Sequence, residues 1–420
     1  MSDIKVFGRI ARPMQRLGYL KRLIKRVAST ASSSLDNVGN DLVDVALKKV
    51  RVPLTPERVT YIKIRLFDQA YKTLKQQADE WLKQGGDAPE VLMELQDVYL
   101  ADPSLPSQVG KLVRDNWKKY PWLGVNLGLI REGTYSINTR GLSLLYYVTD
   151  DEQHSFTEYL PNANPFKLSI SQGLLLLYSC IENDGDVFIR LIHTIINEQL
   201  SSFSDRDAGN FLPEIYLAIV SQFRGRALAI ELRERLQVIS ENAQRIVDAR
   251  KSDKYTGGGI REESSRPRLE PYVDIGLFTK PNPLRYEYTL SPVGLAWAAA
   301  VQSVDGSAAI DGFLKGQYFS TAAQAWQIPA QPLTDRDDIV QRLRQSAQVI
   351  SSSSGYTPIE ELALLAGIDA LVQDHLIIEQ DAAREALLAY QKEHPYEVRF
   401  TVDRMNKLAY ARFMDGVVGS

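Results

Sequence analysis

Clustered lysine and arginine side chains are the residues of this sequence whose spacing most suggests chemistry. Lys111, Arg114 and Lys118 recur at i, i+3 and i+7, a spacing that would place three cations on one face of a helix. No acidic residue lies between them on that face, so the face could bind the phosphates of a nucleic acid. A solvated helix face and a protein-docking face are the two plainer interpretations of the same spacing.

Other cations extend this set to the N-terminal segment and to two later stretches of the chain. The candidate DNA-binding residues are Lys21, Arg22, Lys25, Arg26, Lys111, Arg114, Lys118, Lys119, Arg131, Arg140, Arg266, Arg268, Lys280 and Arg285. Glu262, Glu263 and Glu270 dilute the positive field around the last four of them, so phosphate binding and protein docking are balanced interpretations there.

No constellation typical of catalysis or metal binding is visible. The four histidines lack the i+3 to i+5 spacing of metal-binding pairs: His154, His193, His375 and His394. Cys180 lies in an apolar helical run, which predicts a buried, inert thiol. Asp184 and Asp186 lack the further oxygen ligands of a calcium loop and are expected to cap a helix. We therefore expect no enzyme activity, no metal and no cofactor.

Composition is that of a soluble protein with more than one domain. The chain has 420 residues, of which 44% are hydrophobic and 24% charged, and its net charge is −3. No apolar run approaches the ~18 residues that a membrane span needs. The single cysteine excludes an internal disulfide and favours a reducing, cytoplasmic location.

The N-terminal segment is basic and contains one amphipathic stretch. Leu17, Leu20, Ile24 and Val27 follow helical spacing, and a Ser-rich stretch comes after them. An organelle transit peptide, a membrane-surface helix, a nucleic-acid arm and a plain solvated helix are all compatible with this pattern.

One phrase occurs twice, as VNLGLIREGTYSINTRGLSLLYYV from Val125 and as VDIGLFTKPNPLRYEYTLSPVGLAWAAAV from Val273. Each copy has an apolar–Gly–apolar strand, a polar turn, a Tyr-bearing strand and a Gly-Leu pair that leads into an apolar helix. Three helices are expected before the first copy, over 55–84, 88–102 and 104–120, because caps, prolines and glycines delimit them.

Three helices followed by a β-hairpin resemble the winged helix-turn-helix superfamily. The first copy carries the resemblance on Leu127-Gly128-Leu129-Ile130, Tyr135, Thr139 and Gly141-Leu142, and the second on Ile275-Gly276-Leu277-Phe278, Tyr288, Ser291 and Gly294-Leu295. The first copy departs from the second by one residue fewer between the hydroxyl residue and glycine. The resemblance implies a recognition helix before each hairpin that faces DNA.

Later segments complete a mainly α-helical, multi-domain fold with small β-hairpins. Ser169 and Gln172 have capping-box spacing at the start of a long helix, and Thr357, Pro358 and Glu360 suggest a second such start. The predicted divisions are a basic arm (1–50), a first winged-helix domain (51–160), a helical middle region (161–250), a second winged-helix-like domain (251–330) and a C-terminal helical and hairpin domain (331–420). The last of these could be a third winged-like unit or a small α+β unit.

These features together predict a non-catalytic, cytoplasmic subunit that binds double-stranded DNA. Several winged helices, a basic arm and no active site resemble accessory proteins of bacterial DNA-processing or defence complexes, which implies protein partners. A sequence-specific transcriptional regulator and a scaffold whose winged helices hold proteins are the two alternatives.

Overall fold

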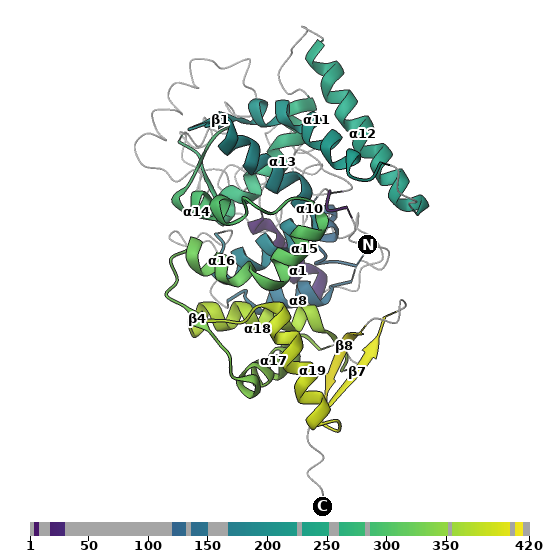
Figure 1. Ribbon diagram of the computed structural model, residues 1–420, viewed down its shortest axis with the longest axis vertical. Coiled ribbons are helices and arrows are strands. Elements are labelled where there is room, and N and C mark those ends of the chain that lie inside the picture. The colour runs from purple at the N-terminus through teal and green to yellow at the C-terminus, as the bar shows by residue number, and fades with distance from the viewer. Residues whose placement is uncertain are drawn as a thin grey trace, which may run out of the picture.

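The computed structural model describes residues 4–7, 17–29, 120–131, 136–149, 167–224, 229–251, 260–281, 286–351, 355–403 and 408–414. The described part is mainly helical with small sheets, which confirms the predicted fold class (Figure 1). The helices predicted before Tyr120 lie outside the described residues.

Helix α10 (Ile170–Asn197) runs through the middle of the molecule. The predicted capping box is confirmed, because the Ser169 hydroxyl accepts from the Gln172 backbone and the Gln172 side chain accepts from the Ser169 backbone. Most of the helix is buried, and it packs against α11, α13, α15 and α18. It bends at Asp184, whose φ of −133° is not helical.

One unit follows directly on α10 and contains the second copy of the repeated phrase. Its elements are β1 (Phe203–Ser204), α11 (Asp205–Ser221), α12 (Ile230–Lys251), α13 (Ile260–Ile275), β2 (Phe278–Thr279) and β3 (Glu287–Leu290). The sheet order is β1-β3-β2, and both pairings are antiparallel. We call this the middle unit. The boundary predicted at 250/251 falls inside it, since β1 pairs with β3 across that position.

The C-terminal unit has a similar order of elements, with two helices instead of three between its first strand and its hairpin. It consists of α17 (Arg336–Ile350), β5 (Thr357–Pro358), α18 (Ile359–Gln373), α19 (Gln380–Glu393), β7 (Val398–Val402) and β8 (Leu408–Phe413). Its sheet order is β5-β8-β7, again antiparallel. The predicted hairpin is confirmed, but the predicted Thr357 cap is wrong. Thr357 pairs with Ala411 in the sheet, and α18 has no side-chain cap.

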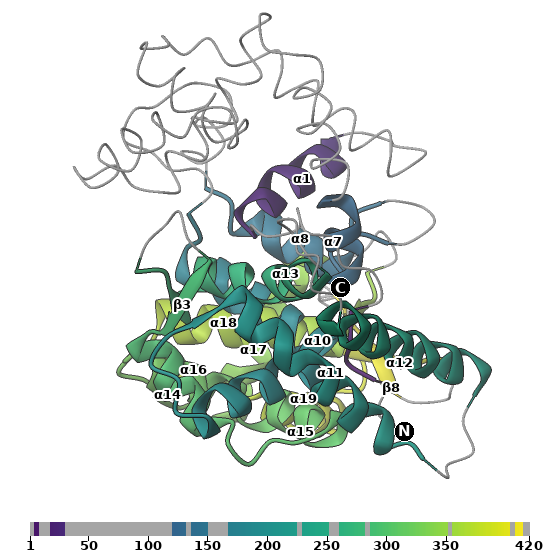
Figure 2. The same ribbon diagram turned by 90° about the horizontal axis from the view of Figure 1, so that it is seen from above.

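The remaining elements connect and cover these two units. They are α1 (Gly18–Ser29), α7 (Tyr120–Asn126), α8 (Thr139–Tyr146), α14 (Pro292–Ala300), α15 (Ser307–Gly316), α16 (Tyr318–Ala325), β4 (Gln331–Pro332) and β6 (Leu376–Ile377), the last two forming a parallel pair. Helices α1, α7 and α8 lie together on one side of the molecule (Figure 2). The predicted apolar face of α1 is confirmed, because Leu17, Leu20, Ile24 and Val27 are all buried.

Two hydrophobic cores follow from this arrangement. The larger one extends from Ile4 to Ala325 and takes in three residues of α18, while the smaller one lies between 339 and 411. In the sheet of the middle unit, the rings of Phe203, Phe278 and Tyr288 contact one another and fill the space between the sheet and α13. Because the smaller core lies within 339–411, the C-terminal unit has a core of its own.

Both copies of the repeated phrase fold in the same way at atomic detail. Gly128 and Gly276 have positive φ angles of 68° and 88° and end helices α7 and α13. In each copy the next amide, of Leu129 or Leu277, bonds the carbonyl five residues earlier, which is the Schellman arrangement. The apolar–Gly pair therefore ends a helix and does not lie within a strand as expected. The first hairpin is reduced to a bridge between Ile130 and Ile137.

The equivalence also corrects the spacing of the hydroxyl residue. Ser291 caps α14 and its hydroxyl donates to the Gly276 carbonyl, while Asn138 caps α8 and its amide donates to the Gly128 carbonyl. Asn138, and not Thr139, is therefore the counterpart of Ser291. With this pairing, the glycine lies three residues after the cap in both copies. The first copy therefore does not lack a residue between the cap and the glycine.

The glycine after each cap allows a close approach of two backbones. A Cβ on Gly294 would lie 2.0 Å from the Leu277 carbonyl oxygen, and one on Gly141 would lie 2.3 Å from that of Leu129. We expect Gly294→Ala to lower the free energy of unfolding by about 2–4 kcal/mol, because backbone must move to admit the methyl group. Urea denaturation of the full chain measures this change.

Gly173→Ala is the matched control, since a Cβ at that position in α10 meets nothing within 4 Å. That substitution should stabilise the helix by about 0.5–1 kcal/mol, because alanine loses less backbone entropy than glycine. Equal stability of the two variants would contradict the close approach as the reason for the glycine.

Candidate functional site

Arg140, expected to face DNA beside the first hairpin, is buried inside the protein. Its guanidinium pairs with Glu182 of α10 and with Glu361 of α18, the latter at 2.5 Å. Burial alone would raise the pKa of Glu182, but the charge of Arg140 holds it below its ordinary value. The pKa of Glu361 stays raised by burial, although Arg140 acts against it. One cation thus serves two carboxylates and joins α8, α10 and α18.

The second group of predicted cations is also occupied within the protein. Arg266 is buried against Asp205 and its guanidinium lies 3.7 Å from the centre of the Tyr286 ring. Lys280 lies over the same ring at 4.6 Å and pairs with Glu270 at 3.0 Å. Glu270, which was expected to dilute the positive field of this region, therefore pairs directly with Lys280.

Arg268 forms the most deeply buried ion pair of this region. Its guanidinium donates two hydrogen bonds to Asp184, at 2.6 and 3.2 Å, and the two side chains are 3% and 1% exposed. Burial lowers the pKa of Arg268, but the charge of Asp184 outweighs it, so the pKa lies above its ordinary value and the guanidinium stays charged. The capping role expected for Asp184 is wrong, since this residue lies at the bend of α10.

The same bend holds a segment from the N-terminus. The Phe7 amide donates to Asp184 at 2.9 Å, and the Lys5 amide donates to Asp186 at 2.8 Å. The Asp186 amide in turn donates to the Lys5 carbonyl. The carboxylates of the bend therefore fasten residues 4–7 to α10 and do not form a site open to solvent.

The other predicted DNA-binding residues fall into three groups: buried, exposed, and outside the described part of the chain. Lys21 is fully buried and its amine donates to the Lys167 carbonyl at 2.7 Å, so it is not a surface cation. Arg131 is exposed beside the first bridge. The remaining predicted residues have side chains outside the described part: Arg22, Lys25, Arg26, Lys111, Arg114, Lys118, Lys119 and Arg285.

The spacing of cations could not reveal these ion pairs, because their partners are distant in the chain. Arg268 and Asp184 are 84 residues apart, and Arg140 and Glu361 are 221 apart. The predictions for Lys21, Arg140, Arg266, Arg268 and Lys280 as phosphate-binding residues are therefore not supported by their surroundings. A carboxylate or a carbonyl already occupies each head group.

Groups typical of catalysis are buried or isolated where the structure describes them. Burial raises the pKa of the Cys180 thiol, as expected of an inert cysteine. His193 contacts the Val301 carbonyl at 2.9 Å. Among the described residues, no group of three or more His, Cys, Asp or Glu side chains is arranged to hold a metal ion. Nor does any helix in that part of the chain combine the length and apolarity needed to cross a membrane.

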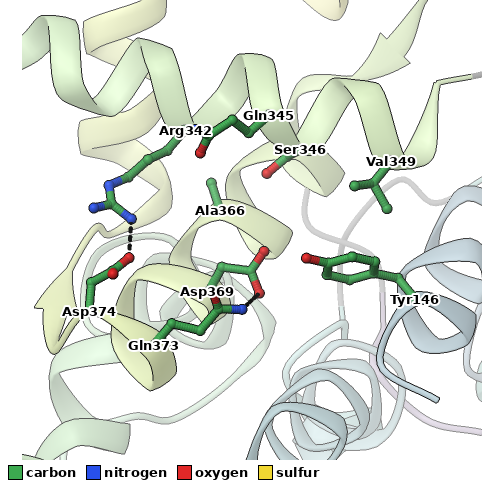
Figure 3. Close-up of a pocket in the computed structure, with 9 residues that line it drawn as sticks. All are labelled: Tyr146, Arg342, Gln345, Ser346, Val349, Ala366, Asp369, Gln373 and Asp374. Carbon is green, nitrogen blue, oxygen red and sulfur yellow. Dashed lines mark hydrogen bonds and ion pairs between the residues drawn. The ribbon is translucent and has the colours of Figure 1, made fainter. Parts of the chain in front are cut away.

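A small polar pocket, which no pattern in the sequence predicts, lies between α8, α17 and α18. Its volume is about 200 Å³, and its lining residues are Tyr146, Arg342, Gln345, Ser346, Val349, Ala366, Asp369, Gln373 and Asp374. The Tyr146 hydroxyl points toward the Asp369 carboxylate, and the Arg342–Asp374 pair lies at the opposite end (Figure 3). Burial raises the pKa of the Asp369 carboxyl, against the hydrogen bond from Tyr147, which lowers it.

Comparison with known proteins returns no relative. No protein-family model, no curated protein and no solved structure matches this chain. The winged-helix resemblance therefore stays a prediction that depends on the sequence and on the order of elements described above.

Arg140 gives a stability prediction that separates its two partners. Arg140→Met removes the cation that pairs with both Glu182 and Glu361, so we expect a loss of about 3 kcal/mol in the free energy of unfolding. The expected loss is at the low end of the range for breaking a buried ion pair, because the Glu182 side chain is partly exposed to solvent. Glu361→Gln keeps the pair with Glu182, so we expect a loss of no more than about 1.5 kcal/mol. Urea denaturation of both variants measures the difference, and equal losses would contradict the shared-cation arrangement.

Proposed function

We propose that this chain is a non-catalytic subunit whose winged-helix units form a rigid scaffold for partner proteins. The order of elements supports the winged-helix assignment, since the middle and C-terminal units each place a helix, a short strand, further helices and a hairpin in sequence. The shared sheet order, in which the first strand pairs with the last, also supports it. Fold alone does not fix function, which depends on the surfaces that each unit leaves free to bind a partner.

The observation that carries the proposal is that the helix before the hairpin is packed inside the protein in the middle unit and partly covered by other helices in the C-terminal unit. In a DNA-bound winged helix this element must expose side chains to the groove. In the middle unit, α13 is buried at every position from 265 to 272. Helices α10, α11 and α12 pack around it, and Asp274 accepts a hydrogen bond from the Leu17 amide. From 265 to 272 this helix therefore leaves no face free for a DNA groove.

The corresponding helix of the C-terminal unit is also ill suited to phosphates. Helix α19 packs against α15, α17 and α18, so part of its surface is covered from outside its own unit. It carries three acids, Asp381, Glu385 and Glu393, against two bases, Arg384 and Lys392. A net negative helix repels the DNA backbone. Both units are therefore better suited to holding protein than to binding DNA.

DNA binding through the first repeat is the second candidate. Arg131 is exposed next to the bridge of the first hairpin, where a wing would contact the DNA backbone. Lys111, Arg114 and Lys118, the cations predicted to share one helix face, precede it in the chain and lie outside the described residues. This candidate retains the double-stranded DNA partner that the sequence predicts, but assigns it to one repeat alone.

Titration of duplex DNA with the full chain at several salt concentrations tests both candidates. The scaffold predicts a nearly flat plot of log affinity against log salt. Binding through the first repeat predicts a slope of about −0.9 for each phosphate contact. The triple substitution Lys111→Ala, Arg114→Ala and Lys118→Ala would then flatten the slope by roughly two to three units.

A second triple variant controls for loss of charge alone. Arg206, Arg233 and Arg245 are exposed on α11 and α12, and their replacement by alanine removes the same charge from another surface. A steep slope that survives the first triple substitution but is lost in the second would overturn both candidates, because it would place the DNA surface on the middle unit.

A further inference from the structure

The pocket between α8, α17 and α18 is small enough to define the size of its occupant. Its volume is about 200 Å³, below the roughly 300–1,000 Å³ of sites that enclose drug-sized ligands or cofactors. Its walls come from the first repeat and from the C-terminal unit. A group the size of a side-chain terminus fits such a space, whereas a nucleotide or a flavin does not.

The charges of the lining select a cation. Arg342 is already paired with Asp374 at 2.5 Å, so its charge is compensated within the pocket. Asp369 remains, and its Oδ1 accepts hydrogen bonds from the Tyr147 hydroxyl and the Gln373 amide. Within the part of the chain that the structure describes, its Oδ2 accepts none. A half-buried carboxylate with one free oxygen is stabilised by a cation that donates to it.

The apolar part of the lining selects a planar cation. Tyr146 is 47% exposed and Val349 is 38% exposed, and both offer apolar surface at the end of the pocket opposite the Arg342–Asp374 pair (Figure 3). A guanidinium group stacks its weakly hydrated faces on such surfaces and donates from its edges. An ammonium is more strongly hydrated and lacks a flat face, so it gains less from these walls.

We propose that this pocket binds a guanidinium group, supplied either by an arginine side chain of a partner protein or by a small free guanidine. One edge of the group donates to the free oxygen of Asp369. The Ser346 hydroxyl, which points into the pocket, accepts from another edge, and Tyr146 and Val349 flank the plane. This inference does not depend on the scaffold proposed above, because the pocket is formed whether or not the chain binds DNA.

Isothermal titration of the full chain with N-acetyl-arginine amide tests the proposal. We expect saturable binding that weakens about tenfold or more in Asp369→Asn, because a hydrogen-bonded ion pair is lost while the shape is kept. Tyr146→Ala should weaken binding several-fold, and Tyr146→Phe should restore most of it. Glu385→Gln is the matched control, since it removes an exposed carboxylate of the same unit, outside the pocket lining, and should leave affinity unchanged.

Three further probes decide the chemistry and its source. N-acetyl-citrulline amide has the same shape without the charge, and its binding as tightly as the arginine probe would overturn the proposal. Equal binding of N-acetyl-lysine amide would overturn the choice of a planar cation, and unchanged affinity of Asp369→Asn would exclude the pocket as the site. Free L-arginine that binds more tightly than the capped amide indicates a small-molecule ligand, whereas the reverse order indicates a partner's side chain.

Discussion

The ion pair between Asp184 and Arg268 is the interaction on which the rest of the structure depends. It lies at the bend of α10, where the Asp184 carboxylate accepts hydrogen bonds from both the Arg268 guanidinium and the Phe7 amide. The residue with non-helical dihedral angles is thus also the residue whose carboxylate bonds two distant segments of the chain. Because α10 packs against both the middle unit and α18, the bend sets how the two units are placed on one helix.

Ion pairs and hydrogen bonds of this kind also occupy several of the basic residues that the structure describes. Arg268, Arg140 and Lys21 each join segments that are far apart in the sequence. Each needs a partner, because a buried charge without one destabilises the folded protein strongly. A cation that is paired inside the protein contributes little to the electrostatic field outside it. Several cations of a chain with net charge −3 are thus paired inside the described part of the protein and add little to its surface charge.

Features with local causes were predictable from the sequence, and features with distant causes were not. The capping box of Ser169 and the β7–β8 hairpin depend on residues a few positions apart, so their spacing reveals them. Thr357 has the same local signal as a cap, but pairing with β8 more than 50 residues later outweighs it. The pocket brings together Tyr146 with residues of α17 and α18, so no local pattern could indicate it.

The repeated phrase shows why a motif can recur while its surroundings change. Its glycines act on the backbone: one ends a helix with a positive φ angle, and the other lets the next helix approach a carbonyl oxygen. These constraints hold whatever the outer face of the preceding helix contacts, so α13 can be buried from 265 to 272 while the first hairpin leaves Arg131 exposed. Recurrence of such glycines therefore argues for a shared turn. What each repeat binds depends on side chains that the turn leaves unconstrained, which is why the free surfaces, and not the motif, carry the functional argument.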